Sequence, residues 1–360
     1  MIAPTKQHPH RSRPRVALGM PVYNGASVLK PTLDSLLSQT YGDFELIISD
    51  NGSTDQTETI CRDYAARDQR ISYVRQPINR GSVWNFNEVF RLARSEYFRW
   101  CACDDLCGPT LLARCVELLD TRPDVVWCHC RSMHIDRYGR PLHGALTREI
   151  SYIGDGDGRP GTATRAAERA SDRFRAVLLG RDGCIDSFAL MRSRVVRQTA
   201  LLLPYFGAEK VFIAELALRG RYAEVPQTLF FVRIHPQAAG AVTTARQQRQ
   251  LVNPLSAKRL QFVRLKLLGG YVAAVRRSPL APAERMQCYG AIAQYVLQVR
   301  KWRRVLAAAL AGAGLRGEYP SSTPAVDSDN CSGAASDLNH RVETAPTTAP
   351  QTPSMARDPI

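Results

Sequence analysis

The chain has 360 residues, of which 44% are hydrophobic and 22% are charged, and its formal net charge at pH 7 is +15. A chain of this length can bury one large core or two modest ones. No stretch approaches the about 20 apolar residues of a membrane-spanning helix, and no apolar signal segment follows the basic N-terminus. We therefore expect a cytoplasmic protein, soluble or peripheral on the inner face of the cell membrane. In that reducing compartment its ten cysteines favour buried free thiols over a zinc cluster.

From residue 16 to about residue 136, short apolar runs alternate with amphipathic segments, which is typical of β-α-β units and a mostly parallel sheet. The expected strands cover residues 16–22, 44–49, 71–74, 97–103 and 125–129. The expected helices begin near residues 27, 54, 83 and 108 and end near residues 40, 67, 94 and 119. The sequence therefore predicts an α/β fold with helices flanking the sheet.

The second half of the chain is predicted to continue this domain to residue 245. Residues 137–165 are rich in Gly, Pro and polar side chains, as in a long active-site loop. Helices are expected at 166–179 and 209–219, and extended segments at 185–191 and 228–234. We take residues 15–245 as one predicted domain in two halves, 15–136 and 137–245, preceded by a basic flexible segment, 1–14.

The positive charge gathers in the predicted C-terminal region, 246–316. Residues 251–316 contain twelve Lys or Arg and a single acid, Glu284. Apolar residues recur there at helical spacing, which predicts amphipathic basic helices that either bind an anionic membrane surface or pack on the domain formed by residues 15–245. Residues 317–360 are rich in Ser, Thr, Pro and Ala, which predicts a disordered tail.

Polar turns follow three of the predicted strands, and the carboxyl ends of parallel strands meet at one sheet edge. Asp104 and Asp105 follow the fourth strand, where two adjacent acids are suited to Mn²⁺ or Mg²⁺ shared with substrate phosphates. Asp50 can accept the imide N–H of a uracil or thymine ring, and Tyr23 offers an aromatic face for stacking. Arg80, after the third strand, adds a guanidinium for a diphosphate. Alone, each feature also fits a plain alternative: a solvated helix cap, a core-edge aromatic or a surface arginine.

Together these motifs resemble the inverting glycosyltransferases of family 2, which have the GT-A fold. The resemblance covers about residues 15–236 and rests on four motifs in order, namely Pro21-Val22-Tyr23-Asn24, Asp50 to Asp55, Asn79-Arg80-Gly81 and Cys103-Asp104-Asp105. It implies a UDP-, GDP- or dTDP-linked sugar donor, and it makes residues 15–245 a catalytic domain with a donor half, 15–136, and an acceptor half, 137–245. Cys103 replaces the leading acid of the family's D-x-D motif, which leaves Asp105 as the safer metal ligand.

The resemblance also implies a role for each matching residue. The donor-binding residues would be Pro21, Tyr23, Asn24, Asp50, Asn51, Arg80, Asp104 and Arg233, and the metal ligands would be Asp105, Asp104 and His235. Glu209 stands where the family places the catalytic base, although Asp is commoner there. The alternative for Glu209 is an acid that complements a helix N-terminus, worth about 0.3–1 kcal/mol. Asp186 is a second candidate for the base or for acceptor binding.

The predicted reaction is the transfer of a sugar to a glycan or lipid-linked acceptor in cell-envelope synthesis. A sugar-phosphate nucleotidyltransferase is a rival, but it normally has a Gly-rich basic loop after the first strand, where this chain has Pro-Val-Tyr-Asn. A nucleic-acid binder is a second rival suggested by the pI of about 9.6. No recognisable nucleic-acid-binding module is present, so nucleic acid is an unlikely partner.

Overall fold

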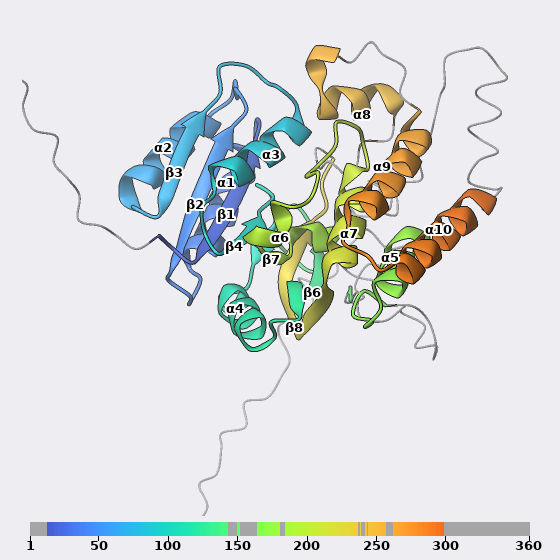
Figure 1. Cartoon of the computed structure of the whole chain (residues 1–360). Coiled ribbons are helices and arrows are strands. Elements are labelled where there is room, and N and C mark those ends of the chain that lie inside the picture. The colour runs from blue at the N-terminus through green and yellow to red at the C-terminus, as the bar shows by residue number, and fades with distance from the viewer. Residues whose placement is uncertain are drawn as a thin grey trace, which may run out of the picture. The chain divides into compact units, whose positions relative to one another are not determined.

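The computed structural model describes residues 13–142, 150–151, 164–180, 184–236, 238, 242, 244–256 and 262–298 (Figure 1). They belong to one compact unit, residues 1–322. The predicted tail, the basic segment 299–316 and most of the predicted loop 137–165 lie outside the described residues.

An eight-stranded sheet forms the centre, in the order β3-β2-β1-β4-β7-β6-β8-β5. Four parallel strands make up its first half: β1 (Val16–Val22), β2 (Phe44–Asp50), β3 (Ile71–Arg75) and β4 (Tyr97–Trp100). In the second half, β6 (Val125–Ile135) is parallel to β8 (Arg221–Arg233), while β7 (Leu190–Arg192) and β5 (Leu106–Cys107) pair antiparallel with their neighbours. The predicted α/β class with a mostly parallel sheet is confirmed.

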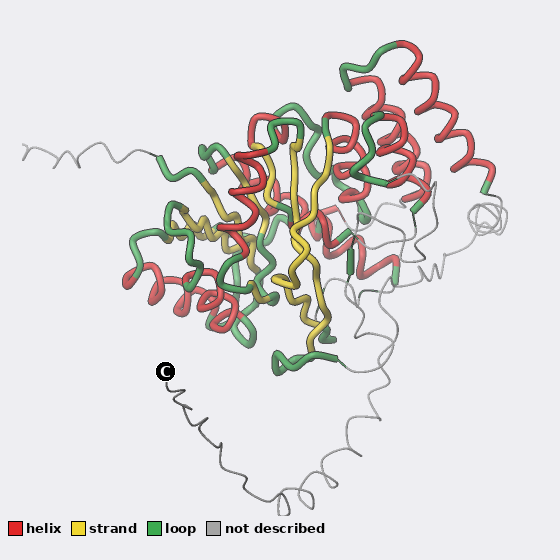
Figure 2. The backbone as a smooth tube through the Cα atoms, turned by 90° about the horizontal axis from the view of Figure 1, so that it is seen from below, coloured by secondary structure: helices red, strands yellow, loops and turns green. Residues whose placement is uncertain are grey.

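Helices cover both faces of this sheet (Figure 2). The helices of the first half are α1 (Leu29–Leu37), α2 (Thr57–Arg67), α3 (Ser82–Leu92) and α4 (Leu111–Thr121). Those of the second half are α5 (Ala170–Leu179), α6 (Ser193–Val196), α7 (Ala208–Arg219), α8 (Ala245–Val252), α9 (Val263–Arg277) and α10 (Pro282–Leu297). Short 3₁₀ helices cover Ile185–Phe188 and Pro254–Ser256.

Two apolar cores lie on opposite faces of the sheet, and β1 contributes to both. Val16, Leu18 and Met20 belong to the core under α1 and α4, whereas Ala17 belongs to the core under α3 and α7. This division follows from the alternation of side chains along a strand. All seven residues of β1 are buried, which explains why its sequence reads as a continuous apolar run.

Four predicted segments differ from the observed elements. The strand expected at 97–103 ends at Trp100, so residues 101–103 form part of the loop that carries Asp104 and Asp105. The strands expected at 125–129 and 228–234 are longer because β6 and β8 pair with each other along most of their length. The extended segment expected at 185–191 is a 3₁₀ helix followed by the three-residue strand β7.

The helices α9 and α10 pack on the catalytic part of the chain. Tyr271 of α9 and Tyr295 of α10 are buried in the same core as Phe212 of α7. The buried carboxylate of Glu215 in α7 also accepts hydrogen bonds from Arg277 at 3.0 and 3.2 Å. Packing on the catalytic domain, one of the two alternatives left open by the sequence, is thus observed for residues 263–297, and contact of their outer face with a membrane stays a prediction. None of the described helices has the length and apolar character that crossing a membrane requires.

Candidate functional site

The loop after β1 is fastened to the loop after β2 by hydrogen bonds. The backbone N–H of Thr54 donates to Asn24 Oδ1 at 2.8 Å, and the N–H of Asn24 donates to Ser53 Oγ at 2.9 Å. Asn24 adopts the left-handed conformation, with φ of 51°, which Asn tolerates better than most residues. Tyr23, beside it, leaves 45% of its surface exposed, while Pro21 is buried within β1. The structure thus brings the first two predicted motifs together and presents Tyr23 to solvent.

Asp50 organises the turn that follows β2. Its side chain is fully buried: Oδ1 accepts from the N–H of Ser53 at 2.8 Å, and Oδ2 accepts from the Tyr73 hydroxyl at 2.7 Å. Burial and this hydrogen bond raise the pKa of Tyr73, which keeps the phenol protonated as the donor. Sequence patterns gave no signal for Tyr73, because it lies on the neighbouring strand. Contact between Asp50 and a nucleobase stays a prediction. It would use the lone pairs left free by these two hydrogen bonds.

Asn51 holds the turn that carries Arg80. Its Nδ2 donates to Asn79 Oδ1 at 2.9 Å and to the Gly81 carbonyl at 3.1 Å, while its Oδ1 accepts from the N–H of Arg80 at 3.0 Å. With 2% of its surface exposed, Asn51 positions this turn. The Arg80 guanidinium lies 4.6 Å from the ring centre of Trp84, and its side chain is exposed.

The last residue of α8, Val252, and the residue after it, Asn253, lie against the same turn. Gly81 has φ of 92°, and a Cβ atom placed on it would collide with the carbonyl of Val252 and lie 2.9 Å from Asn253 Cα. Only glycine meets both requirements, the positive φ and the close backbone approach. The sequence gave no sign of this contact, because Val252 belongs to a region predicted to be separate from the donor half.

The acidic pair is fixed to the end of β8. Asp105 Oδ1 accepts from the backbone N–H of Arg233 at 2.9 Å, and Asp104 Oδ2 lies 2.9 Å from His235 Nε2. Burial, and then the neighbouring charge of Asp104, raise the pKa of Asp105 well above its ordinary value. The structure therefore places Asp104 and Asp105 beside the end of β8 and His235, some 130 positions later in the chain.

Arg233 is buried and its guanidinium is committed to backbone carbonyls. Nε donates to the Asp104 carbonyl at 2.7 Å, and Nη1 donates to the carbonyl of Arg137 at 2.8 Å. These bonds hold the acidic loop against the ends of β6 and β8. The donor contact that the resemblance implies for Arg233 would require some of these hydrogen bonds to break, so the geometry favours a positioning role for Arg233.

A divalent cation fits this site only if the substrate supplies part of the coordination. Within the described residues, no group of three His, Cys, Asp or Glu side chains is placed to hold a metal ion on its own. Asp104 and Asp105 nevertheless offer oxygen ligands beside His235. Mg²⁺ and similar ions are commonly held by one or two carboxylates plus phosphate oxygens, so the donor set suits a site completed by a diphosphate.

Burial, and then the charges of Glu209 and Asp186, raise the pKa of the Cys184 thiol, so the acceptor half places both carboxylates near this thiol. Glu209 lies in the first turn of α7, after Gly207 with φ of 82°. Burial raises the pKa of Glu209 above its ordinary value, opposed by its own backbone hydrogen bond and the charge of Lys210. Asp186 is fully buried, with Oδ2 at 2.6 Å from Arg165 Nη1. This ion pair favours a structural role for Asp186, and direct acceptor contact stays a prediction.

Comparison with known proteins identifies the family. The family described as glycosyl transferase family 2 matches residues 18–199. The chain belongs to this family. It is 34% identical over 118 residues to an uncharacterized glycosyltransferase of Rickettsia typhi, which covers 32% of this chain and 36% of that protein. It is 24% identical over 242 residues to an uncharacterized glycosyltransferase of Haemophilus influenzae, covering 64% of this chain and 68% of that one. The chain thus matches only about a third of the Rickettsia relative's length.

Similar solved structures include two whose complexes contain a nucleotide or a nucleotide-sugar. The first is a mannosyltransferase from Pyrobaculum calidifontis in complex with GDP-Man and Mn²⁺, with 20% identity, a TM-score of 0.49, and coverage of 86% of this chain and 78% of that one. The second is S. aureus TarS 1–349 in complex with UDP, with 14% identity, a TM-score of 0.44, and coverage of 85% and 95%.

Replacing Gly81 with alanine should loosen the segment 244–256, because the added Cβ collides with the Val252 carbonyl and the positive φ disfavours alanine. We expect faster amide hydrogen exchange in residues 244–256 and a loss of about 1–3 kcal/mol in unfolding free energy. Gly42→Ala is the matched control, since nothing lies within 4 Å of its added Cβ. Equal exchange rates in both variants would show that the contact between Gly81 and Val252 does not hold residues 244–256 in place.

Proposed function

We propose that this protein transfers a sugar, with inversion, from a nucleoside diphosphate to a hydroxyl of a glycan or lipid-linked acceptor in cell-envelope synthesis. The observation that carries the proposal is the acidic pair, held by Arg233 and His235 at the sheet edge where the loops of β1 and β2 converge. Family membership favours glycosyl transfer over the nucleotidyltransferase and nucleic-acid-binding alternatives.

In this proposal the donor is a UDP-, GDP- or dTDP-linked sugar. Tyr23 would stack on the base, and Arg80 would neutralise part of the diphosphate charge. Asp104, Asp105 and His235 would hold Mn²⁺ or Mg²⁺, which when bound supplies positive charge for the leaving diphosphate. The hydrogen bonds of Asn51 and Arg233 keep these groups in place before the donor arrives.

Glu209 is the proposed base that takes the proton of the acceptor hydroxyl. A raised pKa makes a carboxylate a stronger base near neutral pH, and burial supplies that rise here. Its place in the first turn of α7 acts in the opposite direction, because the helix dipole stabilises the ionised form and so limits the rise in pKa.

Neutralising the acidic pair should remove metal-dependent nucleotide binding. In the Asp105→Asn and Asp104→Asn variants, we expect the gain in UDP, GDP or dTDP affinity on adding Mn²⁺ to fall by about tenfold or more, because a charged ligand is lost. Isothermal titration calorimetry with and without Mn²⁺ measures this gain. Glu117→Gln on the exposed face of α4 is the control. A gain unchanged in both acidic-pair variants would refute the metal assignment.

Glu209→Gln should lower kcat by about 10²–10⁴, the usual contribution of general base catalysis, while nucleotide binding stays intact. The wild-type rate should fall as the pH falls through the raised pKa of Glu209, since protonation removes the base. When kcat is plotted against pH, the midpoint of its fall on the acid side should therefore lie above pH 4.5, the ordinary pKa of Glu. Full activity in Glu209→Gln would transfer the base role to another acid and leave the donor site standing.

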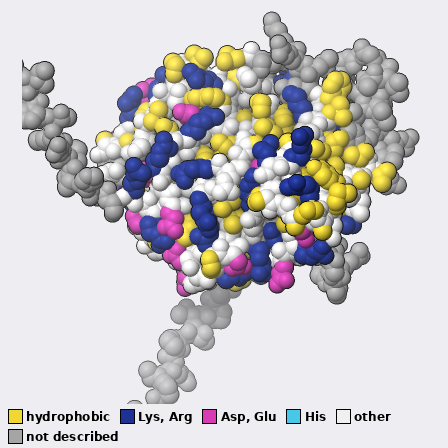
Figure 3. All heavy atoms as spheres, in the orientation of Figure 1, with side chains coloured by type: hydrophobic (Ala, Val, Ile, Leu, Met, Phe, Trp, Pro, Cys, Tyr) yellow, Lys and Arg dark blue, Asp and Glu magenta, His cyan; other side chains and the backbone are white. Residues whose placement is uncertain are grey.

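We also propose an anionic membrane surface as a partner of α9 and α10. Four large apolar side chains are exposed where α9 begins and α10 ends: Phe262 (44%), Leu265 (50%), Val296 (42%) and Leu297 (73%). A hydrogen bond between Arg264 and Tyr295 joins these two helix ends. Figure 3 shows hydrophobic side chains gathered over this side of the molecule, with Lys and Arg among them. Apolar groups beside basic ones are typical of interfacial helices.

Leu265→Glu should weaken co-sedimentation with phosphatidylglycerol vesicles, because it adds a negative charge to the proposed contact. Val74→Glu, at a residue exposed to 37% on β3, is the control and should leave binding unchanged. If both variants bind vesicles as the wild type does, this surface does not contact lipid.

A further inference from the structure

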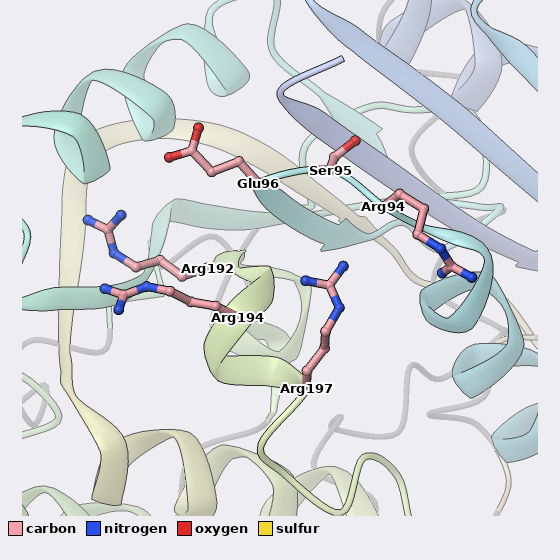
Figure 4. Close-up of a pocket in the computed structure, with 6 residues that line it drawn as sticks. All are labelled: Arg94, Ser95, Glu96, Arg192, Arg194 and Arg197. Carbon is pink, nitrogen blue, oxygen red and sulfur yellow. The ribbon is translucent and has the colours of Figure 1, made fainter. Parts of the chain in front are cut away.

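A second candidate binding site, lined by arginines, lies at the end of β4 opposite the acidic pair. A pocket of about 230 Å³ is lined by residues at the start of β4, after α3, and along β7 and α6: Arg94, Ser95, Glu96, Arg192, Arg194 and Arg197 (Figure 4). Ser95 and Glu96 precede Tyr97, the first residue of β4, whereas Asp104 and Asp105 follow its last residue. The pocket is therefore distinct from the predicted donor site.

The charges that line this pocket are unbalanced. Its one carboxylate, Glu96, already pairs with Arg15 at 3.0 Å. Within the part of the chain that the structure describes, none of the four lining arginines forms an ion pair with a carboxylate. Like charges that share a small pocket repel one another, so an anion bound there would relieve the repulsion.

Two of the arginines are fixed in place by carbonyl groups. Arg192 donates to the carbonyls of Val125 at 2.8 Å and of Leu119 at 2.6 Å, and Arg94 donates to the carbonyls of Arg91 and Ala93. These residues contribute positive charge on a rigid frame. Arg194 and Arg197 are exposed, and the Arg197 guanidinium lies 5.8 Å from the ring centre of Phe90.

The arginines approach the pocket from two sides. In Figure 4 the guanidinium groups of Arg192 and Arg194 lie on one side of α6, and that of Arg197 extends from the other side toward the β4 edge. Long exposed side chains such as Arg194 and Arg197 can turn toward a ligand held between them. A planar guanidinium binds phosphate oxygens through two parallel hydrogen bonds.

We propose that this pocket binds a phosphate group. The pocket has room for several water molecules, each of which takes up about 30 Å³. Pockets that bind larger organic ligands usually have volumes of about 300 Å³ or more. A phosphate fits within this volume. The phosphate is either a free ion or the headgroup of an anionic lipid, because both present the same oxygens to arginine.

The test compares the full-length wild type with the double variant Arg194→Gln/Arg197→Gln. Arg62→Gln/Arg67→Gln on α2 is the matched control, since it removes the same charge from exposed arginines away from the pocket. Thermal unfolding is followed with added inorganic phosphate against sodium chloride of equal ionic strength. Sedimentation with phosphatidylglycerol vesicles, against phosphatidylcholine vesicles, tests the lipid source.

If the pocket binds free phosphate, the apparent Kd for phosphate should rise about tenfold or more in the pocket variant and stay unchanged in the control. If it binds a lipid headgroup, only binding to phosphatidylglycerol should fall in the pocket variant. A phosphate response shared by both variants reports on other sites, such as the predicted diphosphate contact. The proposal is overturned if the pocket variant and the control respond equally to phosphate and to vesicles.

Discussion

The position of β1 between β2 and β4 is the constraint on which the candidate site depends. Both neighbours pair with β1 in parallel, so the polar turns after all three strands meet at one edge of the sheet. The approach is close: a Cβ atom on Gly19 would lie 2.8 Å from side-chain atoms of Phe98 and Val89. Glycine at this point of β1 leaves room for α3 and β4 to pack against the strand, and any larger residue would push them apart.

The residues proposed to bind the metal are distinct from those that hold them in place. Asp104, Asp105 and His235 are the proposed ligands, while the buried Arg233 ties their loop to the ends of β6 and β8. Asn51 has the same relation to Arg80. Such preorganisation spares the donor the entropic cost of ordering two loops, because the protein's own hydrogen bonds order them first.

Local patterns in the sequence were enough to predict the parallel half of the sheet and its loops. Apolar runs, turn residues and strand-end acids are features of neighbouring positions, and they placed β1, β2, β3 and the acidic pair correctly. Contacts between distant segments could not be predicted in this way. The partner of Asp50 is Tyr73, on the next strand, and the guanidinium of Arg233 bonds to carbonyls that no motif marks. The 3₁₀ helix at Ile185–Phe188 was missed because its apolar residues also fit a short strand.

The close approach of Val252 to Gly81 makes the two ends of the catalytic unit interdependent. The Asn-Arg-Gly turn is a short local motif, but Val252 and Asn253, which come far later in the chain, pack directly against it. Exchanging C-terminal helices between relatives would therefore change the wall around Arg80, unless residues 244–256 travel with the donor half. Residues 244–256 therefore constrain the Asn-Arg-Gly motif although they lie outside all four motifs.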